Sequence, residues 1–390
     1  MRVAVVAEYY PGRQDPALGI WAHRQAVAAR EAGANVRVLV LHRPLPTRAA
    51  LRAAGPAALM APLREPVHTV IDGVPITRIP FLAPPRPQTY GTWGAWAAPS
   101  LLLGLKWLRR TFDFDLVHAH YAAPPADAVL RAGVQRPLVV SVHGGDVLGV
   151  VSGWPRTGAR AVRRSLREAR LVLANSAGIE RRCHDLGATS TRVVHLGTDL
   201  PAEIAAPPAD PVLVTVANLV ERKRHSDVLT AFARLRHGYP GLRWEIVGDG
   251  PQREALERQA EEFGCRDAVD FRGACEPRDA VRIARAATVF VLPSVDEAFG
   301  VAYIEAMAGG VPALGCHGEH GPEEITSCGE GMLLVSPRRP EAIEHELRRL
   351  LIDHDERARL SRAARATVEN CFTWEECGRQ TVAAYKAALA

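Results

Sequence analysis

A buried apolar run followed by a glycine turn and a helix-forming series, near residue 300, constrains this chain most. Residues 288–294 (TVFVLPS) have the unbroken apolar core that is typical of a strand buried in a parallel sheet. The turn Phe299-Gly300 and helix formers up to Ala308 follow. A strand, a turn and a helix N-terminus form an anion site, because the first N–H groups and the dipole of the helix favour an anion. The pattern predicts an α/β domain that binds phosphate near residues 300–302.

Two carboxylates, Glu297 and Glu305, flank this phosphate cradle. They would repel a phosphate unless they face another group. An ionised carboxylate only accepts hydrogen bonds, so sugar or ribose hydroxyls, which donate them, are the expected partners. The alternative is a solvated acidic turn that binds nothing.

The length of the chain predicts two domains, because 390 residues are more than a domain with a single hydrophobic core usually contains. The expected linker is 202–211 (AEIAAPPADP), between a domain of residues 1–203 and one of 212–373. No apolar run is long enough to span a membrane, and the N-terminus resembles a first strand rather than a signal peptide. Seven cysteines without a C-x-x-C pair indicate reduced thiols and no metal site. A cytoplasmic protein is therefore expected.

Charge is distributed unevenly between the two halves. Residues 1–203 hold 25 Lys and Arg against 14 Asp and Glu, a net charge of +11, and the remainder has a net charge of −6. Part of the positive charge follows one helix face, at the spacing i, i+3, i+4 and i+7: Arg160, Arg163, Arg164 and Arg167. An anionic bilayer or a phosphorylated acceptor would account for this face, and so would solvation alone. The sequence leaves these alternatives open.

Residues 95–112 form a second unusual helix, which is apolar on most sides and ends in Lys106, Arg109 and Arg110. The pattern favours a crossover helix packed on the sheet. The alternative is a segment that dips into a membrane interface.

Histidines follow two strands of the first half. His118 lies inside the strand 115–119, and we expect it to be a structural, hydrogen-bonded residue. His143 comes directly after the strand 137–142 and before two glycines and Asp146. Ligands of open α/β sheets bind beyond the carboxyl ends of strands, and glycine lets the backbone approach a ligand closely. We therefore expect His143 to contact a substrate.

A basic loop, Glu221 to Arg224, follows the strand 212–218 in the second half. Three cations at the carboxyl end of a strand suit a diphosphate, because charged donors make strong hydrogen bonds to phosphate oxygens. The alternative is an ordinary exposed basic loop.

Together these stretches resemble the retaining GT-B glycosyltransferases of family 4. The resemblance covers nearly the whole chain, and its most specific part is the pair of glutamates eight positions apart with Phe-Gly between them. It implies two Rossmann-like domains that face a central cleft, with the nucleotide sugar on the second and the acceptor on the first. It also implies that a C-terminal helix, residues 374–390, crosses back to the first domain. The matching stretches are HRQA, HAHYAAP, HGGD, LGTD, NLVERK, GDGP and PSVDEAFGVAYIEAMAGGVP.

Carried over by position, the resemblance assigns a role to each matching residue. Glu305 is expected to bind the ribose hydroxyls, Glu297 and His143 the transferred sugar, and Lys223 and Arg222 the diphosphate. Asn218 stands where the family often has arginine. Either Arg222 and Arg224 compensate for the missing charge, or the donor is positioned differently. The other donor-binding positions are Gly19, Asn218, Gly248, Gly250, Ser294, Phe299, Gly300 and Val301.

The resemblance implies a retaining, metal-independent hexosyltransferase with no cofactor besides its donor, UDP-linked or else GDP-linked. The acceptor would be a glycan or glycolipid of the cell surface. The basic helix face and the apolar helix of residues 95–112, rather than the resemblance, suggest peripheral contact with an anionic membrane, and no nucleic acid is expected as a partner. The alternatives are transfer to a soluble small molecule such as an antibiotic core, epimerisation of the nucleotide sugar, and a non-catalytic sugar-nucleotide sensor.

Overall fold

The computed structural model describes residues 1–13, 15–45, 55, 65–85, 89–149 and 156–390. These form two compact units: unit 1 combines Met1–Leu196 with Trp374–Ala390, and unit 2 is Gly197–Thr373. In the described part of the chain, no helix combines the length and the hydropathy that crossing a membrane requires.

Unit 1 is built on an eight-stranded sheet with the order β3-β4-β2-β1-β5-β6-β7-β8. All neighbouring strands run parallel except β3 and β4, which form an antiparallel hairpin around Asp72-Gly73, a typical hairpin turn sequence. The strands are β1 (Arg2–Ala7), β2 (Asn35–His42), β3 (His68–Ile71), β4 (Val74–Pro80), β5 (Leu116–His120), β6 (Leu138–Ser141), β7 (Leu171–Ala174) and β8 (Thr191–Val193).

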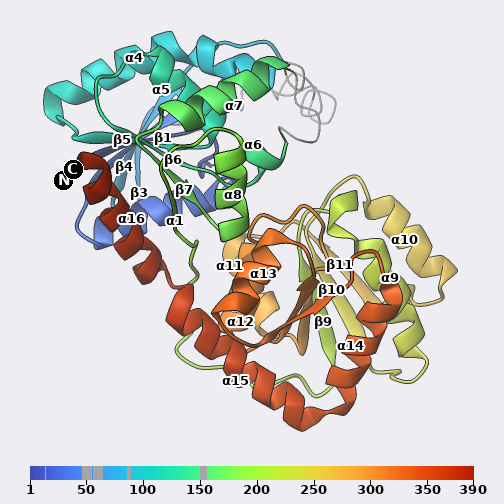
Figure 1. Ribbon diagram of the computed structural model, residues 1–390. Coiled ribbons are helices and arrows are strands. Elements are labelled where there is room, and N and C mark those ends of the chain that lie inside the picture. The colour runs from blue at the N-terminus through green and yellow to red at the C-terminus, as the bar shows by residue number, and fades with distance from the viewer. Residues whose placement is uncertain (14, 46–54, 56–64, 86–88, 150–155) are drawn as a thin grey trace. The chain divides into compact units, whose positions relative to one another are not determined.

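The helices of unit 1 cover both faces of this sheet, with α4, α5 and α7 on one face and α1 and α16 on the other (Figure 1). The C-terminal helix α16 packs closely on α1, since a Cβ added at Gly378 would lie 2.3 Å from the carbonyl oxygen of Ala28. The expected return of the C-terminal helix to the first domain is confirmed. The helices are α1 (Ile20–Glu31), η2 (Tyr90–Thr92), α4 (Trp93–Thr111), η3 (Ala122–Ala126), α5 (Asp127–Arg131), α6 (Gly145–Leu148), α7 (Arg156–Glu168), α8 (Ala177–Asp185) and α16 (Trp374–Leu389).

Unit 2 is an all-parallel sheet with the order β11-β10-β9-β12-β13-β14. Its strands are β9 (Val212–Val216), β10 (Arg243–Val247), β11 (Val269–Gly273), β12 (Val289–Val291), β13 (Ala313–Cys316) and β14 (Met332–Val335). Its helices are η4 (Glu221–Lys223), α9 (His225–Arg236), α10 (Arg253–Glu262), η5 (Arg266–Ala268), α11 (Pro277–Arg285), α12 (Val301–Ala308), α13 (His320–Cys328), α14 (Pro340–Ile352) and α15 (His354–Cys371).

Both sheets are doubly wound, and their strand order reverses at one point. In unit 2 the reversal lies between β9 and β12, and in unit 1 it lies between β1 and β5. Open α/β sheets bind their ligands beyond the carboxyl ends of the strands at this switch point, because the flanking loops diverge there. The fold therefore directs attention to the loops that follow β9 and β12, and to those that follow β1, β5 and β6.

Candidate active site

Two loops meet at the switch point of unit 2. The loop after β9 carries η4, and the loop after β12 leads into α12. The backbone N–H of Val295 donates a hydrogen bond of 2.8 Å to the carbonyl oxygen of Arg222, which ties one loop to the other. The predicted basic loop and the predicted acidic turn therefore lie side by side.

Lys223 and Glu297 form a buried ion pair between these loops. The Nζ atom of Lys223 lies 2.5 Å from Oε2 of Glu297, and the two residues are only 9% and 8% exposed. The same carboxylate oxygen accepts a hydrogen bond of 2.8 Å from the Ser294 hydroxyl. The resemblance assigns Lys223 to a diphosphate and Glu297 to a sugar, whereas here the two side chains bind each other. An ammonium group has three donors, so the ion pair leaves Lys223 capacity for a ligand.

Burial and pairing have opposite effects on the pKa values of this pair. Burial alone would raise the pKa of Glu297, but the Lys223 ammonium and the Ser294 hydroxyl outweigh it and hold the pKa below its ordinary value. For Lys223, burial has the larger effect and lowers the pKa, while Glu297 opposes the shift. A bound diphosphate would add negative charge beside Lys223 and so favour its charged form.

Helix α12 begins at a position that only glycine fits. Gly300 has a left-handed conformation with φ of 83°, and a Cβ there would lie 2.4 Å from the ring of Tyr303. The Tyr303 hydroxyl in turn donates to the carbonyl oxygen of Leu292, which anchors the helix to the end of β12. The first N–H groups of a helix have no partner within it. The N–H of Tyr303 already donates to the Gly300 carbonyl oxygen at 3.0 Å, so the N–H groups of Val301 and Ala302 are those available to an anion. Phe299, just before the turn, is buried against Phe372.

Glu305 lies on the second turn of α12. The Nε atom of Arg285, on α11, donates a hydrogen bond of 3.1 Å to the backbone carbonyl oxygen of Glu305. Burial raises the pKa of the Glu305 carboxyl to about 7, and the Arg285 guanidinium opposes this shift. Near neutral pH this carboxyl is therefore balanced between its neutral and ionised forms, and a ligand that donates hydrogen bonds would favour the ionised one.

Arg222 is the exposed cation of the basic loop, and its Nη1 atom approaches the carbonyl oxygen of Asp296 at 3.5 Å. Arg224 is already paired, because its guanidinium donates to both carboxylate oxygens of Asp227 at 2.8 and 2.9 Å. Asn218 is exposed beside them. Among the described residues, Arg222 is therefore the arginine of this loop without a carboxylate partner, and compensation for the neutral Asn218 stays a prediction.

The remaining glycines of the predicted donor site pack tightly against backbone. A Cβ at Gly248 would lie 1.9 Å from the carbonyl oxygen of Ala217, and one at Gly250 would lie 2.5 Å from that of Leu219, both in the loop after β9. In unit 1, Gly19 precedes α1, and a Cβ there would lie 2.2 Å from the carbonyl group of Tyr9. The neighbouring backbone alone thus requires glycine at these positions, independently of any ligand.

His143 lies at the carboxyl end of β6 in unit 1, next to a second histidine. Its Nε2 atom is 3.0 Å from Nδ1 of His120, and the two rings are nearly coplanar, as a hydrogen bond in the ring plane requires. Burial lowers the pKa of both, that of His120 to about 3, so both rings are neutral at pH 7. The outer nitrogens, Nε2 of His120 and Nδ1 of His143, are buried and have no partner in the described structure. Buried polar atoms are rarely left unpaired, so Nδ1 of His143 marks a place where a ligand or water binds.

Asp146 holds the backbone of this histidine loop. One carboxylate oxygen accepts the His143 N–H at 3.2 Å, and the other accepts the Ala122 N–H at 2.9 Å. Burial raises the pKa of Asp146 to about 6, and these backbone donors limit the rise.

His118 is a structural residue, as the sequence predicts. Its Nδ1 atom lies 2.7 Å from the Tyr385 hydroxyl on α16, and its Nε2 atom lies 2.8 Å from the Ser141 hydroxyl on β6. Both ring nitrogens are therefore paired inside unit 1. His118 therefore differs from its neighbours His120 and His143, each of which keeps one buried nitrogen without a partner in the described structure.

Comparisons with known proteins agree with this geometry. The family model "Glycosyltransferase Family 4" matches residues 18–201, and "Glycosyl transferases group 1" matches residues 198–367. A glycogen synthase of Mycobacterium tuberculosis is 30% identical over 72% of this chain and 70% of its own length. The chain belongs to the group 1 glycosyltransferases. It is therefore a transferase enzyme.

Solved structures show the GT-B fold for this glycosyltransferase. Sucrose-phosphate synthase from Thermosynechococcus elongatus superposes with a TM-score of 0.78 at 21% identity, over 99% of this chain and 98% of its own. HepE of Anabaena, solved in complex with UDP and glucose, has a TM-score of 0.73 at 18% identity, with 99% of each chain covered.

The sequence analysis does not single out Glu319, which supports the loop between β12 and α12 of this glycosyltransferase. Its Oε2 atom accepts the backbone N–H of Glu297 at 2.8 Å, and the N–H of Gly321 donates to the Glu297 carbonyl oxygen at 3.0 Å. Glu319 comes from the loop after β13, so no motif around Glu297 includes it. The signal in the sequence is a second acidic loop after a buried strand of the same sheet, HGEH at residues 317–320.

The arginine face predicted on α7 is only partly free. Arg160, Arg163 and Arg167 are exposed, but Arg164 forms an ion pair with the buried carboxylate of Asp127. Asp127 also binds Arg131 at 2.8 Å. Part of this face is therefore a structural ion-pair cluster between α5 and α7.

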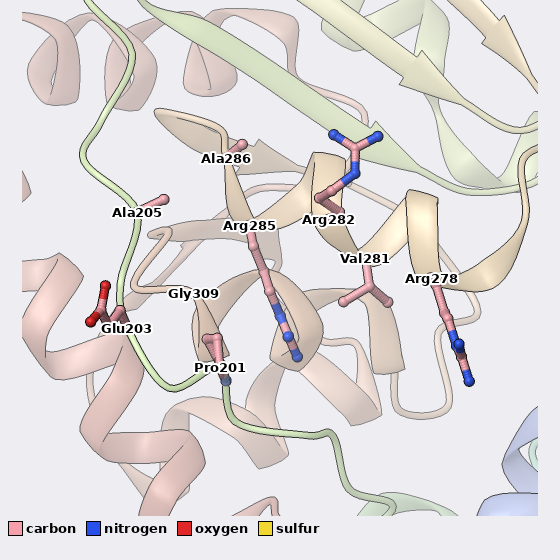
Figure 2. Close-up of a pocket in the computed structure, with 9 residues that line it drawn as sticks. All are labelled: Pro201, Glu203, Ala205, Arg278, Val281, Arg282, Arg285, Ala286 and Gly309. Carbon is pink, nitrogen blue, oxygen red and sulfur yellow. The ribbon is translucent and has the colours of Figure 1, made fainter.

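A cavity of about 310 Å³ lies elsewhere in unit 2, along α11. Figure 2 shows that Arg282 points away from Arg285, so the arginines of its lining do not converge on one point. None of the predicted donor-binding residues lines it. In the described residues, no cluster of His, Cys, Asp and Glu is arranged to hold a metal ion.

Proposed function

We propose that this glycosyltransferase moves a hexose from a nucleotide diphosphate sugar, UDP-linked or else GDP-linked, to an acceptor hydroxyl with retention of configuration. The observation that supports it best is the pairing of two loops at the switch point of unit 2. This pairing sets Lys223 and Arg222 beside the N-terminus of α12, and Glu305 lies on the same helix. The UDP complex of the structurally similar HepE agrees with a nucleotide diphosphate as the donor part.

In the proposed reaction, the bond between the anomeric carbon and the diphosphate oxygen breaks while the acceptor oxygen attacks from the same side. The acceptor proton passes to the departing phosphate oxygen. Lys223, Arg222 and the N-terminal N–H groups of α12 stabilise the charge that develops on the diphosphate, so the reaction needs no metal ion. We assign the acceptor to unit 1, where Nδ1 of His143 is a candidate ligand contact, and the donor, with its sugar beside Glu297, to unit 2.

We assign the acceptor to the glycans or glycolipids of a cell surface. The glycogen synthase relative builds a polysaccharide, and the first half of the chain has a net charge of +11, which suits an anionic acceptor or its surroundings. A neutral soluble acceptor would make no use of this charge.

A donor screen without acceptor tests the proposal. We expect slow hydrolysis of one UDP- or GDP-sugar to free sugar, at a rate that EDTA does not change. A nucleotide sugar that binds without any turnover would indicate a sensor, and conversion to another nucleotide sugar would indicate an epimerase. Activity lost in EDTA and restored by magnesium or manganese would refute the metal-independent mechanism.

Arg222→Gln is the sharpest variant for the diphosphate contact, because Arg222 is exposed and its loss leaves no buried charge unpaired. We expect kcat/KM to fall about 100- to 1,000-fold, as for the loss of one transition-state donor. Arg258→Gln, on the exposed face of α10, is the matched control and should retain activity. Lys223→Ala should cost about 3–4 kcal/mol of transition-state binding. This substitution also leaves the buried Glu297 carboxylate without its ion-pair partner, so the stability of the variant must be measured in parallel.

A further inference from the structure

The outer face of α4 is apolar although it is exposed. Trp96, Leu103 and Trp107 are 52%, 68% and 48% exposed, and their spacing of seven and four residues puts them on one side of the helix. The opposite side is buried on the sheet through Leu101, Leu105 and other residues. Packing as a crossover helix, the expectation from the sequence, explains only this inner side. The outer side needs a separate explanation.

Cations flank this outer face, and carboxylates are absent from the helix. Lys106, Arg109 and Arg110 are exposed in its last turns, and residues 93–111 contain no Asp or Glu. Arg109 is paired with Asp113 at 3.3 Å. No ion pair to a described carboxylate involves Lys106 or Arg110, whose long side chains can extend around apolar surface.

An apolar groove opens beside Trp107. It has a volume of about 330 Å³, and Val70, Ile76, Trp107 and Leu108 contribute to its lining. Val70 belongs to β3, the edge strand of the sheet, and is itself 65% exposed. The groove extends the apolar surface from α4 to the edge of the sheet.

We propose that this α4 face, made of Trp96, Leu103, Trp107, Lys106 and Arg110, docks unit 1 on an anionic lipid leaflet. Exposed apolar patches of this kind mark interaction surfaces. Lysine is depleted in protein–protein interfaces, whereas tryptophan and leucine beside lysine and arginine are typical of helices that lie in a membrane interface. The groove beside Trp107 admits part of an acyl chain.

Of the two helices that the sequence offers for a membrane contact, the exposed side chains favour α4 over α7. The exposed residues of α7 are polar, and Arg164 is bound to Asp127. The arginines of α7 add long-range attraction, which salt screens, but no apolar contact. The proposal does not depend on the donor or the acceptor, because it concerns a surface remote in sequence from the loops of the candidate active site.

Co-sedimentation with vesicles tests the α4 face. We expect the full-length protein to bind vesicles of phosphatidylcholine with 30 mol% phosphatidylglycerol at low salt, and to bind pure phosphatidylcholine far more weakly. The triple variant Trp96→Ser/Leu103→Ser/Trp107→Ser should lower the partition coefficient at least tenfold. Lys106→Gln/Arg110→Gln should lower it further, by about fivefold for each charge, at low salt only.

Two controls distinguish vesicle binding by this face from nonspecific adsorption and from a loss of folding. Ile352→Ser removes a side chain that is 64% exposed on unit 2 and should leave vesicle binding unchanged. Donor hydrolysis and thermal unfolding of the triple variant should match wild type, which shows that it is folded. The proposal is refuted if the wild-type protein does not bind anionic vesicles at low salt, or if the triple variant binds them as tightly as the wild type does. Sedimentation velocity that shows a wild-type dimer and a monomeric triple variant, without vesicle binding, would assign the face to a second copy of the chain instead.

Discussion

Glu305 is a carboxyl whose protonation should control donor binding. Burial raises its pKa to about 7, so at pH 6 most of the free protein carries the neutral form and at pH 8 most carries the ionised form. Ribose hydroxyls donate to the ionised form. Binding at low pH must therefore release a proton, and the affinity for the donor should rise as pH rises.

We expect the affinity for the nucleotide sugar to increase about tenfold between pH 6 and pH 8, as one ionisation coupled to binding requires. Calorimetry with the intact nucleotide sugar measures this cleanly, because its diphosphate does not titrate in this range. Glu305→Gln should bind more weakly at pH 8 and lose the pH dependence while keeping its fold. A flat wild-type profile, or an unchanged affinity in Glu305→Gln, would contradict the ribose assignment.

At the scale of elements, a buried hydrogen bond joins the C-terminal helix to the sheet. The Tyr385 hydroxyl on α16 lies 2.7 Å from Nδ1 of His118 on β5. Burial raises the pKa of Tyr385 and lowers that of His118. The phenol therefore stays protonated and the imidazole stays neutral, so the hydroxyl donates and the ring accepts.

Tyr385→Phe should destabilise unit 1 by about 1–3 kcal/mol, because it leaves Nδ1 of His118 buried without a partner. Chemical denaturation followed by circular dichroism gives this difference. Tyr239→Phe is a matched control, since no hydrogen bond of the Tyr239 hydroxyl occurs in the described structure and the residue is only partly buried. Equal stability of the two variants would show that the hydrogen bond between Tyr385 and His118 does not contribute to stability.

The elements themselves follow from local sequence patterns. The apolar run at residues 288–294 gives β12, Asp72-Gly73 gives the hairpin of β3 and β4, and the glycine turn gives the start of α12. Each of these depends on neighbours in the chain, through side-chain periodicity or backbone conformation. The α/β class and the order of elements could therefore be predicted.

The partners inside the candidate site could not be predicted from the same patterns. Lys223 and Glu297 are 74 residues apart, and Arg164 and Asp127 are 37 apart, so these pairs depend on the order of strands and not on local spacing. Sequence position put Lys223 near a phosphate, but only the packed loops show its contact with Glu297. Exposure is a further limit, since an apolar helix such as α4 does not reveal in its sequence which of its faces stays uncovered.

At the scale of the whole molecule, the two units differ in how the chain builds them. Unit 2 is one continuous segment, Gly197–Thr373, with its own six-stranded sheet and core. Unit 1 is discontinuous, because α16 must return to pack on α1. Most of the candidate donor-binding residues, from Asn218 to Glu305, belong to unit 2, whereas His143 belongs to unit 1.

A fragment of residues 197–373 should therefore fold alone and bind the nucleotide part of the donor. We expect its dissociation constant for the nucleoside diphosphate to lie within about tenfold of the value for the whole chain, because the cations and Glu305 are all retained. Donor hydrolysis should be absent, since His143 and unit 1, to which we assign the acceptor, are missing. Arg222→Gln in the fragment should weaken binding as it does in the whole chain, and this shows that the same loop is used. A folded fragment that does not bind the nucleotide would mean that unit 1 supplies essential donor contacts. The loop that contains Gly19 would then be the first candidate for these contacts.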